Sequence, residues 1–386
     1  MLGDRKPRSP LLVQFRRELL LLLAGTVAPL LIFVGCGSGG AQRQSSPPGH
    51  QFTNFDVPQA GTASGQGTYS LEINANGDVT GYYIDANFGS HAFIRSSAGS
   101  FTVFDAPGAN TMSICGTEVT SINSRGETAG FFCDTNGLEH SFFRDASGTI
   151  TTFDPAGTSG AQSLNDSGTV AGGYVDAFGA HGYLRAPDGT FTTFDPTGDP
   201  SEVRIVIPYH INASGTTAGM YTDTSGVYHG FLLDSNGTIT ILDAPGAGTG
   251  SGMGTEIVDM NASGTTVGAI NVGVVNGVGT THSLMRTADG TYTIFDPPQA
   301  NGVSSYAYGI NDSGAIVGTY RNASLVRHGY VREPDGSFVT LDDPDAAALT
   351  YSVTNLGTTP LSINAAGVVV GLFTDAAGIR HGFIWQ

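Results

Sequence analysis

Lysine is almost missing from this chain: of 386 residues only Lys6 is a lysine, and charged residues of all kinds make up 13%. Acidic residues outnumber basic ones by 33 to 16. Loss of the first 36 residues would leave 31 acidic residues against 11 arginines, because only Asp4 and Glu18 among the acids lie there. A charge this negative repels nucleic acid and anionic lipid, so we expect neither as a partner of the folded part. It fits solubility or cation binding, and solubility is the simpler interpretation.

The sequence also lacks the motifs of common enzyme classes. It contains no Gly-x-Ser-x-Gly, no phosphate-binding loop, no His-Glu-x-x-His and, with three cysteines, no Cys-x-x-Cys. No segment after residue 50 keeps a helical period of 3.6 residues. We therefore expect an all-β chain that binds neither a metal nor a cofactor.

One pattern is repeated seven times. Each copy has an Asn with a Gly three residues later, a short apolar run containing another Gly, a His, and an ending that resembles Phe-Thr-x-Phe-Asp. The distance from one Asn to the next is 42 to 53 residues, which is typical of β-propellers and solenoids. The asparagines are Asn74, Asn123, Asn165, Asn212, Asn261, Asn311 and Asn364.

Each copy predicts four short strands, which we call a, b, c and d in chain order. In the sixth copy these are residues 305–310, 315–320, 328–332 and 338–341, separated in part by Asn-Asp-Ser-Gly and Pro-Asp-Gly turns. Asn, Asp and Gly tolerate the positive φ angles that tight hairpin turns require. The pattern therefore predicts antiparallel four-stranded blades.

The two ends of the repeat region are complementary. The region opens with an isolated d strand at residues 52–56, and the chain stops after a c strand at residues 381–385. Pairing of these strands would complete one blade and remove two free sheet edges. We predict a seven-bladed β-propeller over residues 51–386, closed by this pairing; an open β-solenoid is the alternative.

The units resemble the extracellular repeat family named for its His-Ala-Phe signature. The signature appears as His91-Ala92-Phe93, and a hairpin of the form Ile-Asn-x-x-Gly-x-x-x-Gly appears from Ile310 to Gly318. The family's usual Asp-Leu-Gly segment is replaced by Phe-Asp-x-Pro-Gly, as in residues 104–108. The resemblance covers nearly everything after residue 50 and implies an exported repeat protein, without catalytic residues to carry over.

The N-terminus has the features of an export signal. A basic segment precedes an apolar run at residues 19–34, which is too short for a comfortable membrane span. The run leads to Phe33-Val34-Gly35-Cys36, which resembles a bacterial lipobox. We predict a lipoprotein signal over residues 1–36 with Cys36 lipidated, and a flexible tether over 37–50. An ordinary signal peptide or an uncleaved anchor is the alternative. The expected location is the bacterial cell envelope or the exterior, with membrane contact only through the anchor.

Cys115 and Cys133 remain. If the turn that begins at Asn123 joins strands a and b, the two cysteines lie across or beside one ladder. In an exported protein this favours a disulfide over two buried thiols.

The repeated histidines are interpreted as structural. Seven equivalent copies indicate a role in the frame, where an imidazole that begins strand c can bond nearby backbone or the Asp that ends strand d. The Asp-x-x-Gly turns at Asp134, Asp223 and Asp375 lack the further carboxylates of a calcium loop and predict turn capping. The histidines are His91, His140, His181, His229, His282, His328 and His381.

A functional site should break the repeat. The d-to-a connections and the ends of the innermost strands repeat least, and we expect their side chains to converge on an acidic pocket at the channel mouth. The candidates are Glu72, Glu118, Arg204, Tyr209, His210, Glu256, Asp259 and Tyr308.

Two classes of function follow. The first is a monomeric binding or structural scaffold that recognises a protein, a glycan or a cell-envelope component through one propeller face. The second is an exported hydrolase or lyase that uses Glu72, His210 and Asp259 as acid, base or metal ligands. Polar residues fill the mouth of any such channel, so the sequence favours the scaffold.

Overall fold

The computed structural model describes residues 50–275, 278–347 and 357–386. These residues form 28 strands, β1 to β28, and two three-residue 3-10 helices, Pro200–Glu202 (η1) and Pro298–Ala300 (η2). The prediction of an all-β chain is confirmed.

After β1 (Phe52–Phe55), consecutive strands pair antiparallel in six groups of four and a last group of three. The early groups are β2 (Gly67–Ile73), β3 (Val79–Ile84), β4 (Ser90–Arg95) and β5 (Phe101–Phe104); then β6 (Thr117–Ile122), β7 (Thr128–Cys133), β8 (Glu139–Arg144) and β9 (Ile150–Phe153); then β10 (Thr158–Leu164), β11 (Val170–Val175), β12 (Ala180–Arg185) and β13 (Phe191–Phe194).

The later groups continue the same order. They are β14 (Val203–Ile211), β15 (Thr217–Asp223), β16 (Tyr228–Leu233) and β17 (Ile239–Leu242); then β18 (Gly254–Met260), β19 (Thr266–Val275), β20 (Val278–Arg286) and β21 (Tyr292–Phe295); then β22 (Ser304–Ile310), β23 (Ile316–Arg321), β24 (Arg327–Arg332) and β25 (Phe338–Leu341); and finally β26 (Gly357–Ile363), β27 (Val369–Thr374) and β28 (Arg380–Trp385).

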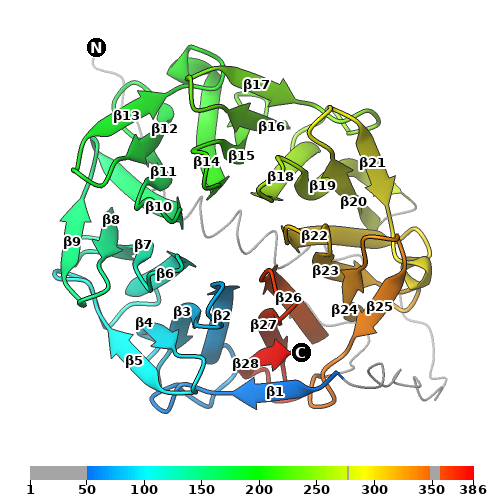
Figure 1. The fold of residues 1–386 in the computed structure, drawn as a ribbon, viewed down its shortest axis with the longest axis horizontal. Coiled ribbons are helices and arrows are strands. Elements are labelled where there is room, and N and C mark those ends of the chain that lie inside the picture. Colours follow the sequence, from blue (N-terminus) through cyan, green and yellow to red (C-terminus); the bar gives the residue numbers. More distant parts are fainter. Residues whose placement is uncertain (1–49, 276–277, 348–356) are drawn as a thin grey trace, which may run out of the picture.

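The groups are arranged around a common centre (Figure 1). Strand a of each group lies innermost and strand d lies at the periphery. Because the pairing is antiparallel, the b-to-c turns and the d-to-a connections lie at one end of the strands, which we call the loop face. The a-to-b turns, which carry the repeated asparagines, lie at the opposite end with the c-to-d turns; we call it the asparagine face.

The N-terminal strand joins the C-terminal group. β1 pairs antiparallel with β28, with Phe52 opposite Trp385 and Phe55 opposite Gly382. The predicted pairing of these two segments is therefore present, and β1 takes the peripheral place that strand d holds elsewhere (Figure 1).

A β-bulge near the end of each strand a explains the repeated glycine in strand b. In β2 the register shifts between Ser70 and Glu72, so that Leu71 is left without a partner on β3. The bulge brings the carbonyl oxygen of Tyr69 against Gly81, where a Cβ would lie 1.9 Å from that oxygen. Any larger residue would force the two strands apart, so the glycine is required by the close approach.

The core lies between neighbouring groups rather than within one sheet. One cluster joins Ala129 of β7 to Ala161, Val170 and Tyr183 of the next group. Another joins Phe55 of β1 and Val370 of β27 to Val79 and Phe93 of the first group. Each sheet therefore buries both faces against its neighbours.

Candidate functional site

The bulge places the least repetitive side chains on the innermost strands. Glu72, His210 and Asp259 each follow the bulge and stand two residues before the turn asparagine. These residues are half-buried, as are Tyr209 and Tyr308 at the bulge itself. Bulges often redirect side chains toward functional sites, so the residues beside these bulges are the first candidates for a functional site.

The candidate residues lie at different positions along the innermost strands, which we call levels, and do not form one pocket. Glu72, His210 and Asp259 lie at the asparagine-face end of their strands, away from the d-to-a connections with which they were expected to form a pocket. Arg204 lies at the other end, where its guanidinium donates to the carbonyl oxygen of Thr224 on the loop face. The expectation that all eight candidates converge at one mouth is therefore wrong, because the two ends of strand a reach opposite faces.

Within the first level, His210 and Asp259 form a close pair. The distance from His210 Nδ1 to Asp259 Oδ1 is 2.8 Å. Burial acts to lower the pKa of His210, but the charge and hydrogen bond of Asp259, together with the charges of Glu72 and Asp312, outweigh it, and the net shift of the pKa is upward. Burial raises the pKa of Glu72 to about 7, against the backbone hydrogen bond from Ile122. The charge of His210 acts to lower the pKa of Glu72 and the charge of Asp259 acts to raise it, so the three groups interact electrostatically.

Backbone contacts engage both carboxylates of this level. Glu72 Oε2 accepts a hydrogen bond from the backbone N–H of Ile122 in the next group, at 2.8 Å. Asp259 Oδ2 accepts one from the N–H of Ile310, also at 2.8 Å and also in the next group. Serines at the same repeat position do the same: Ser121 accepts from Leu164 and Ser163 from Ile211. The side chain at this repeat position therefore links adjacent groups by a hydrogen bond to the backbone.

A second level lies deeper along the strands. Buried Glu256 accepts a hydrogen bond from the Tyr306 hydroxyl at 2.9 Å and another from the Asn271 side chain. Tyr308 stacks on Tyr306 with the ring centres 4.6 Å apart. Burial raises the pKa of both tyrosines, so these hydroxyls stay protonated.

The two remaining candidates take part in packing around this level. Tyr209 packs against Ile205, Ile207 and Met220. Glu118 is buried on β6, at the repeat position of Glu256. Within the described ranges, no three His, Cys, Asp or Glu side chains lie close enough together to hold a metal ion.

The repeated histidines bind the aspartates that end strand d. In all seven copies the imidazole Nδ1 lies 2.7 to 3.0 Å from an aspartate oxygen, as in His91 with Asp105. The last pair, His381 with Asp56, joins β28 to β1 across the chain termini. Hydrogen bonds donated to the carboxylates of Asp296 and Asp56 raise the pKa of His282 and His381. The histidines are part of the frame, as their repetition indicates. The pairs are His91 and Asp105, His140 and Asp154, His181 and Asp195, His229 and Asp243, His282 and Asp296, His328 and Asp342, and His381 and Asp56.

The Asp-x-x-Gly turns are capped by their own aspartates. Asp134 Oδ1 accepts hydrogen bonds from the N–H groups of Asn136 and Leu138, both at 2.8 Å. The backbone hydrogen bond from Leu138 lowers the pKa of Asp134. Asp223 and Asp375 make the corresponding bonds to Val227 and Ile379.

The turn asparagines do more than cap their turns. The side-chain Oδ1 accepts from the N–H groups two and four residues later, as Asn364 does from Ala366 and Val368. The Nδ2 group then donates to the backbone oxygen of the asparagine in the next group. Six such links measure 3.0 to 3.3 Å, including one from Asn364 back to Asn74. The sequence predicts the turn but not this link, whose only signal is that the residue is always Asn and never Asp.

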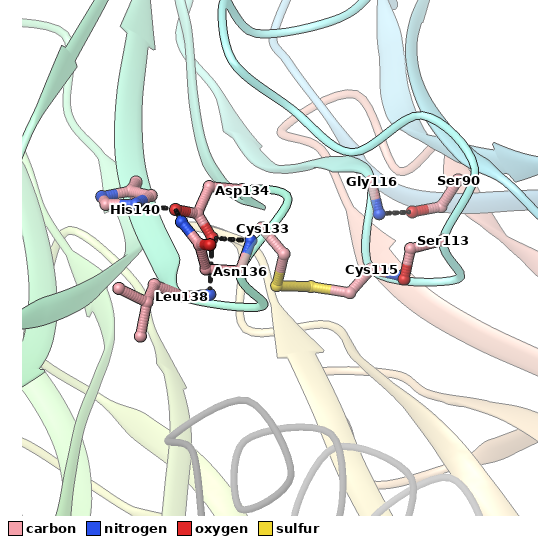
Figure 2. Close-up of a disulfide and its surroundings, with 9 residues drawn as sticks. All are labelled: Ser90, Ser113, Cys115, Gly116, Cys133, Asp134, Asn136, Leu138 and His140. Carbon is pink, nitrogen blue, oxygen red and sulfur yellow. Dashed lines mark hydrogen bonds and ion pairs between the residues drawn. A yellow bond between two sulfur atoms is a disulfide. The ribbon is translucent and has the colours of Figure 1, made fainter.

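A disulfide joins Cys115 and Cys133, with their Cα atoms 5.5 Å apart (Figure 2). It ties the connection between β5 and β6 to the end of β7. The Asn110 N–H also donates to the Cys133 carbonyl at 2.7 Å, so the connection is held at two points.

The predicted signal with Cys36, and the predicted tether up to residue 49, lie outside the described residues. Across the described ranges, no helix is long and apolar enough to cross a membrane.

Comparison with known proteins identifies the fold. No protein-family model and no curated protein matches the chain. A streptogramin B lyase is similar with a TM-score of 0.55 and 14% identity, over 87% of this chain and 97% of that one. Virginiamycin B lyase from Staphylococcus aureus gives 0.53 and 12%, over 87% and 99%. The β-propeller domain of the Trilobed protease from Pyrococcus furiosus gives 0.53 and 9%, over 84% and 95%. Identities this low show the fold alone, a β-propeller.

Proposed function

We propose that this protein is a binding scaffold built as a closed seven-bladed β-propeller. The groups of four strands provide the blades, and β1 with β28 completes the last one. The link from Asn364 to Asn74 and the pair of His381 with Asp56 also connect the two ends of the repeat region, which supports a closed ring over an open solenoid.

The scaffold belongs to the cell exterior in this proposal. The basic and apolar N-terminal segments, the lipobox-like sequence that ends at Cys36 and the resemblance to the His-Ala-Phe repeat family support a lipid-anchored location on the bacterial envelope. The protein acts as a monomer in this proposal. Its partner would be a protein, a glycan or another envelope component. The disulfide between Cys115 and Cys133 fits such a location, because disulfides persist in oxidising compartments.

One observation carries the scaffold function: the polar residues that break the repeat near the centre are engaged in holding the frame. Glu72 and Asp259 accept backbone N–H groups of the next blade, and Glu256 is satisfied by Tyr306 and Asn271. The described parts of the d-to-a connections, by contrast, differ in length and composition from blade to blade and lie at the loop face. Loops on a rigid frame are where binding residues concentrate.

Photo-crosslinking tests this proposal in living cells. A photoreactive amino acid at Thr135, on the loop face, should give crosslinked products on illumination. The same amino acid at Ser147, on the asparagine face of the same blade, is the matched control and should give few. Both positions are exposed, so accessibility does not distinguish them. Products from Ser147 alone, or from neither site, would argue against a loop-face scaffold.

The second candidate function is a hydrolase or lyase at the His210–Asp259 pair. Asp259 holds His210 Nδ1 at 2.8 Å, which is how a carboxylate orients a histidine base. The similar solved structures include lyases, an analogy at the level of the fold. An activity lost in His210→Ala but unaffected by loop-face substitutions would establish this function in place of the first.

A further inference from the structure

Exposed apolar side chains gather on the loop face of the first two blades. Met112 and Ile114 lie in the connection between β5 and β6, and Met112 is 77% exposed. Phe88, in the b-to-c turn of the first blade, is 45% exposed, and Leu138 occupies the equivalent turn of the second blade. Phe178 lies in the equivalent turn of the third blade and is as exposed as Met112. We call the first four residues the apolar patch.

Hydrogen bonds and a disulfide hold the backbone of the apolar patch in place. The N–H of Ser90, beside the first turn, donates to the carbonyl of Ser113 at 3.0 Å. On the other side, Cys115 is bonded to Cys133, and Leu138 closes the turn that follows (Figure 2). The connection that carries Met112 and Ile114 is thus held between the two turns. Apolar groups fixed in this way lose little conformational entropy when a partner binds.

Phe88 is kept at a backbone position that disfavours it. Its φ is 65°, in the left-handed region, where three equivalent turns have Gly137, Gly226 and Gly378 at φ of 78° to 88°. Leu325, in the equivalent turn of the sixth group, shares this conformation at 63°. A residue with a side chain is strained there, because its Cβ crowds the backbone. Exposed phenylalanine gains little from packing to offset this strain. Strain of this kind concentrates at binding sites.

The surroundings of the apolar patch are acidic. Asp85, Asp105, Asp134 and Asp154 are partly exposed near it, each close to a histidine of the frame. The only basic residues from 79 to 144 other than histidine are arginines 95, 125 and 144, and all three lie in or beside turns of the asparagine face. The loop face of these blades therefore combines apolar contact with negative charge.

We propose that the apolar patch binds a basic, amphipathic segment of another protein. This rests on the proposed scaffold function and names its partner's chemistry. Apolar side chains of the segment would cover Met112, Ile114, Leu138 and Phe88, while its lysines or arginines would meet the surrounding aspartates. A second copy of this chain is disfavoured by its own charge of −17, and anionic lipid by the same repulsion.

Binding of a fluorescent amphipathic peptide of leucine and lysine to the full-length purified protein tests the proposal. Anisotropy should show saturable binding that weakens with salt, and a matched leucine and glutamate peptide should not bind. Met112→Ser with Ile114→Ser should weaken binding about tenfold or more. Ile241→Ser with Ile294→Ser is the matched control. These isoleucines are exposed on the outer strands β17 and β21, and their loss should leave binding within about twofold.

The variant Phe88→Gly distinguishes a loss of peptide binding from a loss of stability. Glycine suits the positive φ, so the melting temperature should hold or rise while peptide binding weakens. The proposal is overturned if Met112→Ser with Ile114→Ser binds as tightly as the unaltered protein, if the glutamate peptide binds equally, or if phosphatidylcholine vesicles bind at the patch instead. Crosslinks from Thr135 without peptide binding would refute the basic partner but leave the scaffold standing; loss of those crosslinks would refute the scaffold itself.

Discussion

Phe55→Ala is expected to destabilise the protein by about 3–5 kcal/mol, the usual cost of removing a buried phenylalanine. Phe55 is the last residue of β1 and is 9% exposed. Its ring meets Phe93 edge to face, with centres 6.4 Å apart, and lies 5.0 Å below the Arg95 guanidinium carbon. The side chain thus joins the N-terminal strand to the first blade as well as to the last. Urea unfolding measures the loss directly.

Phe104→Ala is the matched control for this substitution. Phe104 ends β5, the corresponding strand of the next blade, and makes equivalent contacts: Phe142 at 6.2 Å and the Arg144 guanidinium carbon at 4.8 Å. It is half-buried, whereas Phe55 is buried. If β1 is held as firmly as a strand within a continuous blade, the two substitutions should cost similar free energies. A full cost for Phe104 with less than about 1 kcal/mol for Phe55 would mean that β1 is not docked.

Asn364→Ala should destabilise the protein by about 1.5–2.5 kcal/mol. The substitution removes the cap on the N–H groups of Ala366 and Val368, worth about 1 kcal/mol by analogy with helix caps. It also removes the hydrogen bond from Asn364 to the buried carbonyl of Asn74, worth about 0.5–1.5 kcal/mol more. That carbonyl still accepts from the Gly77 N–H at 3.1 Å, so it is not left without a donor. Denaturant unfolding at neutral pH is the measurement.

Two further variants separate the cap from the link between blades. Asn364→Asp keeps an oxygen for the cap but sets a carboxylate oxygen against the Asn74 carbonyl, so it should destabilise at least as much as alanine at neutral pH. Asn76→Ala should cost less than about 1 kcal/mol, because Asn76 also donates to the next blade, to Ser124 at 2.6 Å, but from an exposed position. An Asn364→Asp variant as stable as the original would show that the link adds nothing.

The sequence predicts local structure closely because its turns are chemically explicit. The four strands expected in the sixth copy begin and end within one residue of β22 to β25. The pairing of His with the Asp that ends strand d follows from their fixed places at adjacent strand ends. The meeting of the first and last strands follows from the split copy at the two ends of the chain.

The candidate site was predicted less well. It depends on where along strand a each residue lies and on which backbone groups of the next blade it contacts. Counting from the turn asparagine identifies Glu72 and Asp259 as irregular positions, but it cannot show that backbone N–H groups of neighbouring blades already occupy their oxygens. The apolar patch was missed for a related reason. Met112 and Leu138 are unremarkable in sequence, and only the fold brings them together on one exposed surface.

The most direct test of the closed ring is a disulfide between Gln51→Cys and Gln386→Cys. The two backbones exchange hydrogen bonds of 2.8 and 3.2 Å, and both side chains are exposed. Paired residues of this kind have Cα atoms about 5.5 Å apart, within the range that a disulfide spans. A closed propeller predicts rapid oxidation within one molecule and a higher melting temperature. Thiols that stay free in the folded monomer, or that react only between molecules, would contradict the closed ring.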